Sequence, residues 1–139
     1  MIQRNVTIEQ LNKMSKNTMM QHLDIEFTEV GEDFVRAKMP VDHRHHQPYG
    51  LLHGGASVVL AETLGSVAAH YSVKDPNKLT VGLEINANHM KSVRSGFVVG
   101  TAHPLHIGKS TQVWEIKIVN EQDELVCVSR LTMAVIERK

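Results

Sequence analysis

One segment near the middle of the chain is apolar on nearly every side. It reads GGASVVLAETLGSVAAHY, extends from Gly54 to Tyr71 and contains no proline. A helix that is apolar all round is a buried helix. Three polar residues, Glu62, Thr63 and Ser66, interrupt the run, and it is short for a membrane span. The segment therefore predicts one long helix at the centre of the protein, which the rest of the chain must cover.

The remainder of the chain predicts strands. A short first helix begins at Thr7, whose side chain suits a capping box with Gln10. Alternating apolar residues over 23–28 and 35–39 then favour a β-hairpin. Short turns join the later strands, which favours antiparallel pairing, and the sheet must bury its apolar face on the central helix. We expect an α+β fold, a single domain over residues 1–139, with an antiparallel sheet curled around one helix. The predicted later strands are Leu79–Met90, Phe97–His103, Thr111–Val119 and Leu125–Ile136.

One helix cannot cover both faces of such a sheet. Apolar side chains remain for the outer face, where we expect Trp114 or its neighbours. The edges of an open sheet also favour pairing with another strand. We therefore expect at least a homodimer.

The charge balance excludes some partners. Fifteen basic residues offset fifteen acidic ones, so no net field attracts nucleic acid or an anionic membrane. The single cysteine, Cys127, lies in an apolar run and is expected in the core. The first residues, MIQRNVTIEQ, contain no apolar signal segment. We expect a soluble, cytoplasmic protein without nucleic-acid or membrane partners.

The stretch HRHHQPYGLLHGG contains four of the nine histidines and raises the question of a metal site. Its spacings are those of a loop and lack the i, i+4 pairing of a helical zinc site. No second cluster supplies cysteines or carboxylates. We interpret His43, His45 and His46 as a solvated loop and expect neither a metal nor a cofactor.

The glycine pair Gly54–Gly55 stands where the buried helix begins. The first amides of a helix have no internal partner and lie at the positive end of its dipole. Glycine lets a ligand approach such a backbone, so these amides suit an oxyanion hole. The alternative is a helix start that needs glycine for packing, and two adjacent glycines alone are weak evidence for a site.

Glu62 is the most unusual residue of the apolar helix. An unpaired buried carboxylate is costly, so its presence needs a reason. Ser66 lies four residues later on the same helix face, and the two side chains could hold a water. A structural hydrogen bond or a buried ion pair would explain Glu62 as well. Upstream, Gln47 and His53 are candidates to bind a carbonyl oxygen or simply to tie down the loop.

Cations gather in two further segments, NHMKSVR and HIGKS. They suit phosphate binding, although solvated strand ends would have the same composition. The basic side chains concerned are His89, Lys91, Arg94, His106 and Lys109.

Three motifs, QPYGLLHGGASVVLAETLGSVAAH, VGLEINANHMKSVRSG and TQVWEIKI, resemble the hotdog-fold acyl-CoA thioesterases over essentially the whole chain. The resemblance is closest to the bacterial branch that includes the 1,4-dihydroxy-2-naphthoyl-CoA thioesterases of menaquinone synthesis and the proofreading thioesterases of enterobactin synthesis. It implies a hotdog fold that forms homodimers or homotetramers, and hydrolysis of an acyl-CoA to free acid and CoA.

The resemblance also implies roles for individual residues. Glu62 is the nucleophile or the general base, and Glu62 and Ser66 act from the partner subunit. Gln47, His53 and the Gly54 amide polarise the thioester carbonyl. The implied acyl group is aromatic, similar to 1,4-dihydroxy-2-naphthoyl or benzoyl. The implied CoA-binding residues are Gly55, Gly82, His89, Met90, Lys91, Ser92, His106, Ile107, Gly108, Lys109, Ser110 and Thr111.

Other functions of the same fold stay open at this point. One is a non-catalytic domain that binds or senses acyl-CoA, and another is a proofreading thioesterase for aryl carrier-protein thioesters. A hydratase would need a different acid–base pair. An aromatic acyl group needs a flat apolar slot, although the same slot would accept a medium aliphatic chain. The expected lining of this slot is Tyr49, Leu51, Val59, Leu64 and Val67.

Overall fold

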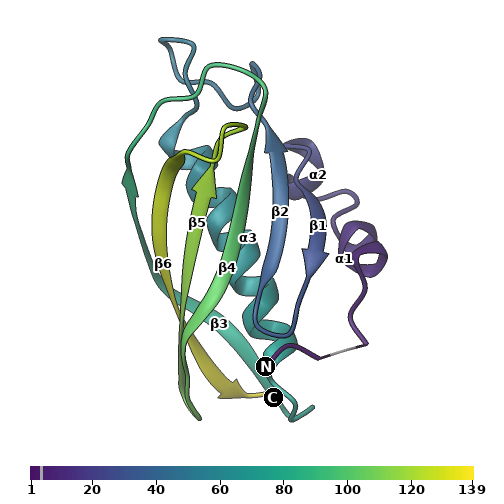
Figure 1. The fold of residues 1–139 in the computed structure, drawn as a ribbon. Coiled ribbons are helices and arrows are strands. Elements are labelled where there is room, and N and C mark those ends of the chain that lie inside the picture. Colours follow the sequence, from purple (N-terminus) through teal and green to yellow (C-terminus); the bar gives the residue numbers. More distant parts are fainter. Residues whose placement is uncertain (4) are drawn as a thin grey trace.

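A six-stranded antiparallel sheet lies across the long helix α3 (Gly54–Ser72) in the computed structural model, which describes residues 1–3 and 5–139 (Figure 1). The strand order is β1-β2-β4-β5-β6-β3. This is the α+β architecture that the sequence predicts, with α3 ending one residue beyond the expected Tyr71. The strands are β1 (Glu26–Val30), β2 (Val35–Pro40), β3 (Lys78–His89), β4 (Phe97–Ile107), β5 (Thr111–Val119) and β6 (Leu125–Glu137).

Two glycines let α3 approach the sheet closely. A methyl group on Gly65 of α3 would lie 2.5 Å from a side-chain carbon of Leu131, and one on Gly100 of β4 would lie 2.7 Å from Leu64. Leu60 and Leu64 project from α3 into this interface and have no exposed surface. Each contributes about 1.5–3 kcal/mol by burial, so this contact fixes where the helix lies on the sheet.

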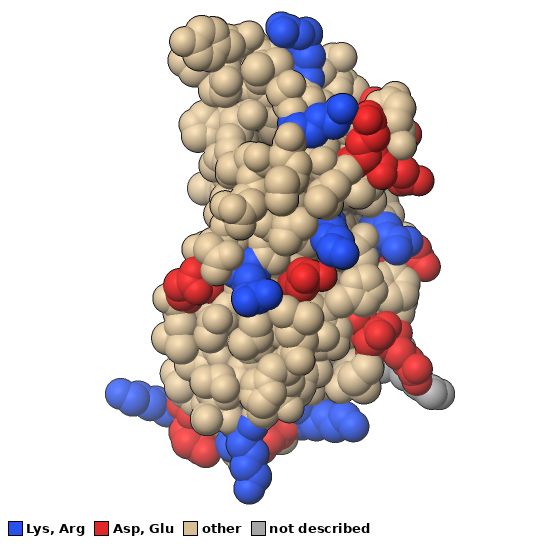
Figure 2. All heavy atoms as spheres, turned by 60° about the vertical axis from the view of Figure 1, so that its left-hand side comes forward, with Lys and Arg blue, Asp and Glu red and all other residues tan. Residues whose placement is uncertain are grey.

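The two edge strands of the sheet, β1 and β3, differ in what lies against them. At the β1 edge, the Asn12 side chain accepts a hydrogen bond from Phe27 N (2.8 Å) and donates one to Phe27 O (3.1 Å). At the β3 edge, Val81 and Leu83 are 38% and 60% exposed. Figure 2, in which this side of the molecule comes forward, shows a mostly uncharged face with scattered charges of both signs. The β3 edge therefore exposes apolar side chains and has a strand neighbour, β6, on one side only.

Two short helices precede the sheet and lie beside β1 (Figure 1). Helix α1 (Ile8–Met14) has the expected capping box between Thr7 and Gln10. Helix α2 (Met19–His22) was not expected, because four residues carry no readable periodicity. The described residues form no helix of the length and apolarity that a membrane crossing needs.

Trp114 corrects one expectation. It is fully buried in the core, and its indole nitrogen donates to Gln112 Oε1 at 2.8 Å. Gln112 in turn donates to Ser72 Oγ at 3.0 Å, which ties β5 to the last turn of α3. Trp114 therefore faces the helix and does not lie on the outer face of the sheet. Cys127 is buried as expected, and burial raises the pKa of its thiol.

Candidate active site

Residues 42–46 of the histidine-rich loop hydrogen-bond to two neighbouring segments, and we call these residues the bracket. His45 is 1% exposed, so its assignment to a solvated loop is wrong. Its Nε2 lies 2.7 Å from Leu23 O, and its Nδ1 accepts a hydrogen bond from Asp42 N at 3.2 Å. His46 Nε2 lies 2.8 Å from Arg94 O. These contacts join the loop to the end of α2 and to the segment before β4.

Asp42 and Arg44 reinforce this bracket. Arg44 donates two hydrogen bonds to the Asp42 carboxylate, at 3.0 and 2.8 Å, and a third to His22 O at 3.0 Å. The hydrogen bonds from Arg44 hold the pKa of Asp42 well below its usual range. Across the described residues, no group of three or more His, Cys, Asp or Glu side chains is arranged to bind a metal.

After this loop the chain reaches the start of α3, where His53 is the N-cap. Its Nδ1 accepts a hydrogen bond from Gly55 N at 2.7 Å, and its carbonyl accepts from Ala56 N and Ser57 N at 3.0 and 3.3 Å. His53 therefore ties down the helix start. These bonds occupy three of the first helical amides and leave the Gly54 N–H, among the described residues, without a backbone partner.

Polar side chains border the same cavity as Gly54. The His89 ring covers Gly54 so closely that a methyl group there would lie 2.9 Å from Nε2. Gln47 Oε1 accepts from Tyr49 N, which leaves the Gln47 amide hydrogens to donate elsewhere. Ser57, which sequence reasoning missed, is 1% exposed and borders the same cavity of about 290 Å³. Its position in the first helical turn, three residues after Gly54, could have indicated that it lies near the helix start. The cavity is also bordered by Leu51, Leu52, Met90, Lys91, Ser92 and Val126.

Glu62 faces a second and larger cleft. In the single chain Glu62 is exposed, so the expectation of a buried carboxylate is wrong. Glu62 and Ser66 both border this cleft of about 570 Å³, as their common helix face predicts. A methyl group on Gly82 of β3 would lie 3.3 Å from Glu62 Oε2. Gly82 is therefore a direct neighbour of the carboxylate.

One chain does not bring the carboxylate and the Gly54 amide to one point. Glu62 lies eight positions after Gly54 on α3, which corresponds to about 12 Å along the helix axis. A reacting carbonyl must lie about 3 Å from both an attacking group and an oxyanion donor. Within one chain, the carboxylate and the Gly54 amide therefore face separate cavities.

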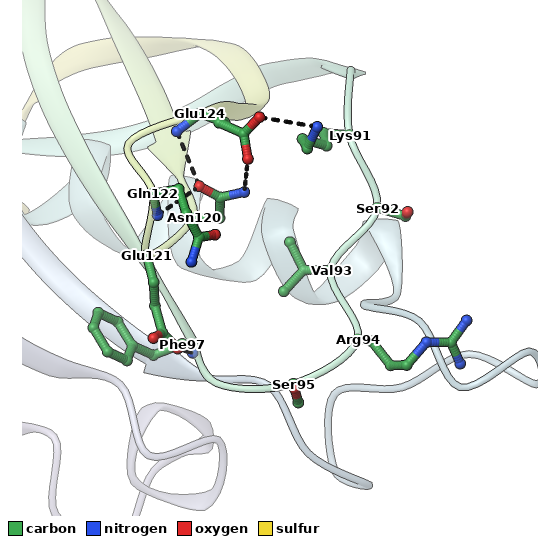
Figure 3. Close-up of a pocket in the computed structure, with 10 residues that line it drawn as sticks. All are labelled: Lys91, Ser92, Val93, Arg94, Ser95, Phe97, Asn120, Glu121, Gln122 and Glu124. Atoms are coloured by element: carbon green, nitrogen blue, oxygen red, sulfur yellow. Dashed lines mark hydrogen bonds and ion pairs between the residues drawn. The ribbon is translucent and has the colours of Figure 1, made fainter.

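The basic side chains of the two predicted phosphate-binding segments also lie in separate places. Lys91 lies beside the first cavity, where its ammonium contacts Glu124 Oε2 at 3.0 Å. Figure 3 shows Lys91 reaching Glu124, whose other oxygen accepts from Asn120 Nδ2 at 3.0 Å. Asn120 and Lys91 lower the pKa of Glu124. The adjacent polar pocket is bordered by residues of the 91–97 and 120–124 segments.

The turn at 106–111 lies at the opposite end of the molecule. Ser110 O accepts from Val135 N at 2.9 Å, and Gln112 contacts Ser72 at the last turn of α3. His106 folds over Gly108, because a methyl group there would lie 2.6 Å from its Nε2. Most of the length of β3, about 30 Å, separates this turn from His89. Within one chain, the two groups of predicted CoA-binding residues do not meet.

The expected aromatic slot does not form as predicted. Tyr49 is 82% exposed, and Leu64 is fully buried under the sheet. Leu51 borders the smaller cavity, whereas Val59 and Val67 border the cleft beside Glu62. Only the last two therefore share a cavity with the carboxylate.

Comparisons with known proteins match the chain to thioesterases. Residues 49–127 match the family model of the thioesterase superfamily. The chain is 53% identical over 133 residues to the 1,4-dihydroxy-2-naphthoyl-CoA hydrolase of Escherichia coli, covering 96% of this chain and 97% of that one. It is 51% identical over 132 residues to the proofreading thioesterase EntH of Cronobacter turicensis, covering 95% of this chain and 96% of EntH. The crystal structure of a thioesterase from Haemophilus influenzae superposes with a TM-score of 0.93 at 49% identity, covering 98% of this chain and 94% of that one.

Proposed function

Since the chain belongs to the thioesterase superfamily and is a thioester hydrolase with the hotdog fold, we propose that it cleaves aromatic acyl-CoA thioesters with Glu62 as the acting carboxylate. The reaction consumes water and releases a free acid and CoA. The observation that carries the proposal is the Gly54 N–H, which remains available at a helix start whose neighbouring amides His53 occupies.

This amide suits the charge that develops during hydrolysis. Attack on a thioester carbon places negative charge on the carbonyl oxygen, and a helix N-terminus with a free N–H stabilises that charge. The Gln47 amide borders the same cavity and supplies a second donor. His53 acts through Gly55: by capping the helix, it holds the Gly54 amide in place.

Glu62 has two chemically complete routes. As a nucleophile, its carboxylate forms a mixed anhydride with the acyl group while CoA thiolate departs, and water then cleaves the anhydride. As a general base, it removes a proton from water, which attacks the thioester directly. Ser66 is placed on the same face to hold that water. Single-turnover hydrolysis in oxygen-18 water separates the routes, because only the first incorporates enzyme oxygen into the acid.

We further propose that two copies complete each active site. The edge strand β3 has a strand neighbour on one side only and exposes Val81 and Leu83, so it can pair antiparallel with β3 of a second copy. A pair centred between Ile85 and Asn86 sets Gly82 of one copy opposite His89 of the other. Glu62 lies beside Gly82, and Gly54 lies beside His89, so this register would bring the partner's carboxylate toward the oxyanion donors.

The same pairing unites the predicted CoA-binding residues. The segment His89–Ser92 and the turn at 106–111 lie at opposite ends of β3 within one chain. In an antiparallel pair, each end meets the opposite end of the partner. Lys91 from one copy and Lys109 from the other then supply cations for one CoA, together with Gly55, Met90, His106, Ile107, Gly108 and Thr111. A homotetramer is formed when two such dimers associate.

Mixing two inactive variants tests the shared site. Glu62→Ala and Gln47→Ala each damage every site of their own homodimer. In a mixed dimer, one site receives both intact residues and the other receives neither. Co-refolded equal mixtures should therefore recover up to about a quarter of wild-type turnover, since half of the dimers are mixed and half of their sites are intact. Recovery no greater than the sum of the two homodimers would mean that each site lies within one chain.

The acyl and carrier groups are tested with a substrate panel. The named activity of the relative in Escherichia coli supports a naphthoyl-CoA substrate, which would place a cytoplasmic enzyme in menaquinone synthesis. The similarity to EntH supports a second candidate, a proofreading thioesterase that acts on aryl carrier-protein thioesters. Values of kcat/KM for dihydroxynaphthoyl-CoA, benzoyl-CoA, straight-chain CoA thioesters and an aryl carrier-protein thioester decide between them. A straight-chain preference of tenfold or more would refute the aromatic assignment.

A further inference from the structure

The cleft beside Glu62 has one wall on α3 and another on the two N-terminal helices. The α3 wall extends from Val59 to Tyr71, about 18 Å along the helix. The opposite wall consists of three methionines, Met14, Met19 and Met20. These are three of the seven methionines in the chain, and they fall within seven residues. The cleft thus combines the proposed catalytic carboxylate with an unusual concentration of thioethers.

The three thioethers are held to different degrees. Met14 Sδ accepts a hydrogen bond from the Tyr71 hydroxyl at 3.8 Å. Met20 is half-buried against the core, and its sulfur lies 4.0 Å from Ser15 Oγ. Met19 is 63% exposed, and its sulfur has no hydrogen-bond partner among the described residues. Two methionines are therefore anchored, and the third is free to change its rotamer.

The backbone beneath Met19 is nevertheless fixed. Thr18 caps α2 by accepting from Met20 N at 3.2 Å, and its hydroxyl donates to Ser15 O at 2.6 Å. Asn12 attaches α1 to the start of β1 through its two hydrogen bonds with Phe27. A mobile side chain on a fixed support can adjust to a ligand without disturbing the fold.

We propose that these methionines form the specificity-determining wall of the acyl site and that Met19 is its adjustable member. The inference rests on the proposed function, because Glu62 and Ser66 place the thioester carbon at one end of this cleft. A cleft of about 570 Å³ is large enough for a one- or two-ring acyl group. Unbranched thioethers fit irregular shapes and contact aromatic rings favourably through sulfur. The wall therefore favours aromatic acyl groups and tolerates several ring sizes.

The test compares an acyl group that reaches the wall with one that is too short to do so. Values of kcat/KM for benzoyl-CoA and acetyl-CoA are measured for the wild type, Met19→Ala and Met19→Leu. Ile8→Ala is the matched control, because Ile8 is an exposed apolar residue of α1 that does not border the cleft. Light scattering after size exclusion reports the oligomeric state of each variant.

Met19→Ala should lower kcat/KM for benzoyl-CoA by about twofold to tenfold, the range of a single sulfur–aromatic contact. Hydrolysis of acetyl-CoA should change by less than twofold. Met19→Leu, which keeps the bulk but loses the sulfur, should fall between wild type and Met19→Ala, and Ile8→Ala should match wild type.

Three results would overturn the proposal. An unchanged benzoyl-to-acetyl ratio in an active enzyme would exclude Met19 from the acyl site while leaving the thioesterase assignment intact. A smaller assembly in Met19→Ala would mean that the methionines contact another subunit. Absence of acyl-CoA hydrolysis in the wild type would refute the proposed function itself, and the acyl wall with it.

Discussion

Gly82→Ala is expected to raise thermal stability and to lower turnover at the same time. Gly82 lies within β3, and its φ is outside the left-handed region, so alanine fits the backbone. Replacing glycine in a strand interior reduces the entropy lost on folding and stabilises the protein by about 0.5–1 kcal/mol. For a chain of this size, that corresponds to an increase in Tm of about 2–4 °C.

The loss of turnover follows from two contact distances. The new methyl group lies 3.9 Å from Met133 Sδ, which is ordinary van der Waals contact, but only 3.3 Å from Glu62 Oε2. The carboxylate must therefore move by about 0.3 Å to restore a normal contact. If a displacement of about 1 Å costs about 100-fold in rate, 0.3 Å costs about threefold to fivefold. The expected change is in kcat, because Glu62 is the carboxylate that we propose to act on the thioester carbon.

Thiol release from an aromatic acyl-CoA measures kcat and KM, and a thermal melt at the same pH measures Tm. Thr80→Ala is a suitable control, because it removes atoms from the same face of β3 without adding any beside Glu62. A rise in Tm with kcat unchanged would refute the position-sensitive role of Glu62. A rise in KM alone would assign Gly82 to ligand binding, and a fall in both Tm and kcat would indicate a folding defect.

Other predictions concern the histidine-rich loop. Asp42→Asn should lower Tm at neutral pH by an amount equivalent to about 1 kcal/mol or less, since solvent screens a carboxylate that is 38% exposed. Folding lowers the pKa of Asp42, so the ionised carboxylate stabilises the protein at pH values above the unfolded pKa of about 3.9. This stabilisation is lost as the pH falls below that value. The decrease of Tm at acidic pH should therefore be smaller in Asp42→Asn than in the wild type. His45→Ala should cost about 1–3 kcal/mol in chemical denaturation, because Leu23 O loses its buried partner; a neutral result would contradict the bracket. Dialysis against a chelator should leave hydrolysis unchanged, because His45 and His46 are already engaged by backbone groups, whereas loss reversed by one divalent ion would identify a metal enzyme.

The long helix was predictable because two independent signals agree. A continuous apolar run and a glycine pair at its start place α3 within one residue of its observed end. The order of the strands was not predictable in the same way. An alternation of period two identifies a strand but does not identify its partner, and β3 pairs with β6 although β4 follows it in the chain. Trp114 illustrates the same limit. The alternation of apolar residues around it identifies a strand, but which face of the sheet it occupies depends on the order of the strands.

The burial of His45 depended on an element that the sequence did not reveal. Its surroundings in sequence are polar, and its Nε2 partner is the carbonyl of Leu23 at the end of the four-residue helix α2. The Glu62 and Ser66 pair was predictable from spacing alone, since residues four apart share a helix face. Ser57 was missed because reasoning about the helix start considered its backbone amides and not the next buried hydroxyl.

The exposure of Glu62 is the most informative difference between expectation and structure. The sequence of α3 is apolar all round, which is the pattern of a helix covered on every side, yet one face of α3 borders an open cleft in the single chain. Val59 on this face is only partly buried, and Glu62 beside it is exposed. An apolar helix face that its own chain leaves uncovered is explained when something else covers it in the working protein. The proposed second copy paired along β3 and an acyl group bound against the methionines would together provide that cover, so both proposals explain why this helix face is exposed in the single chain.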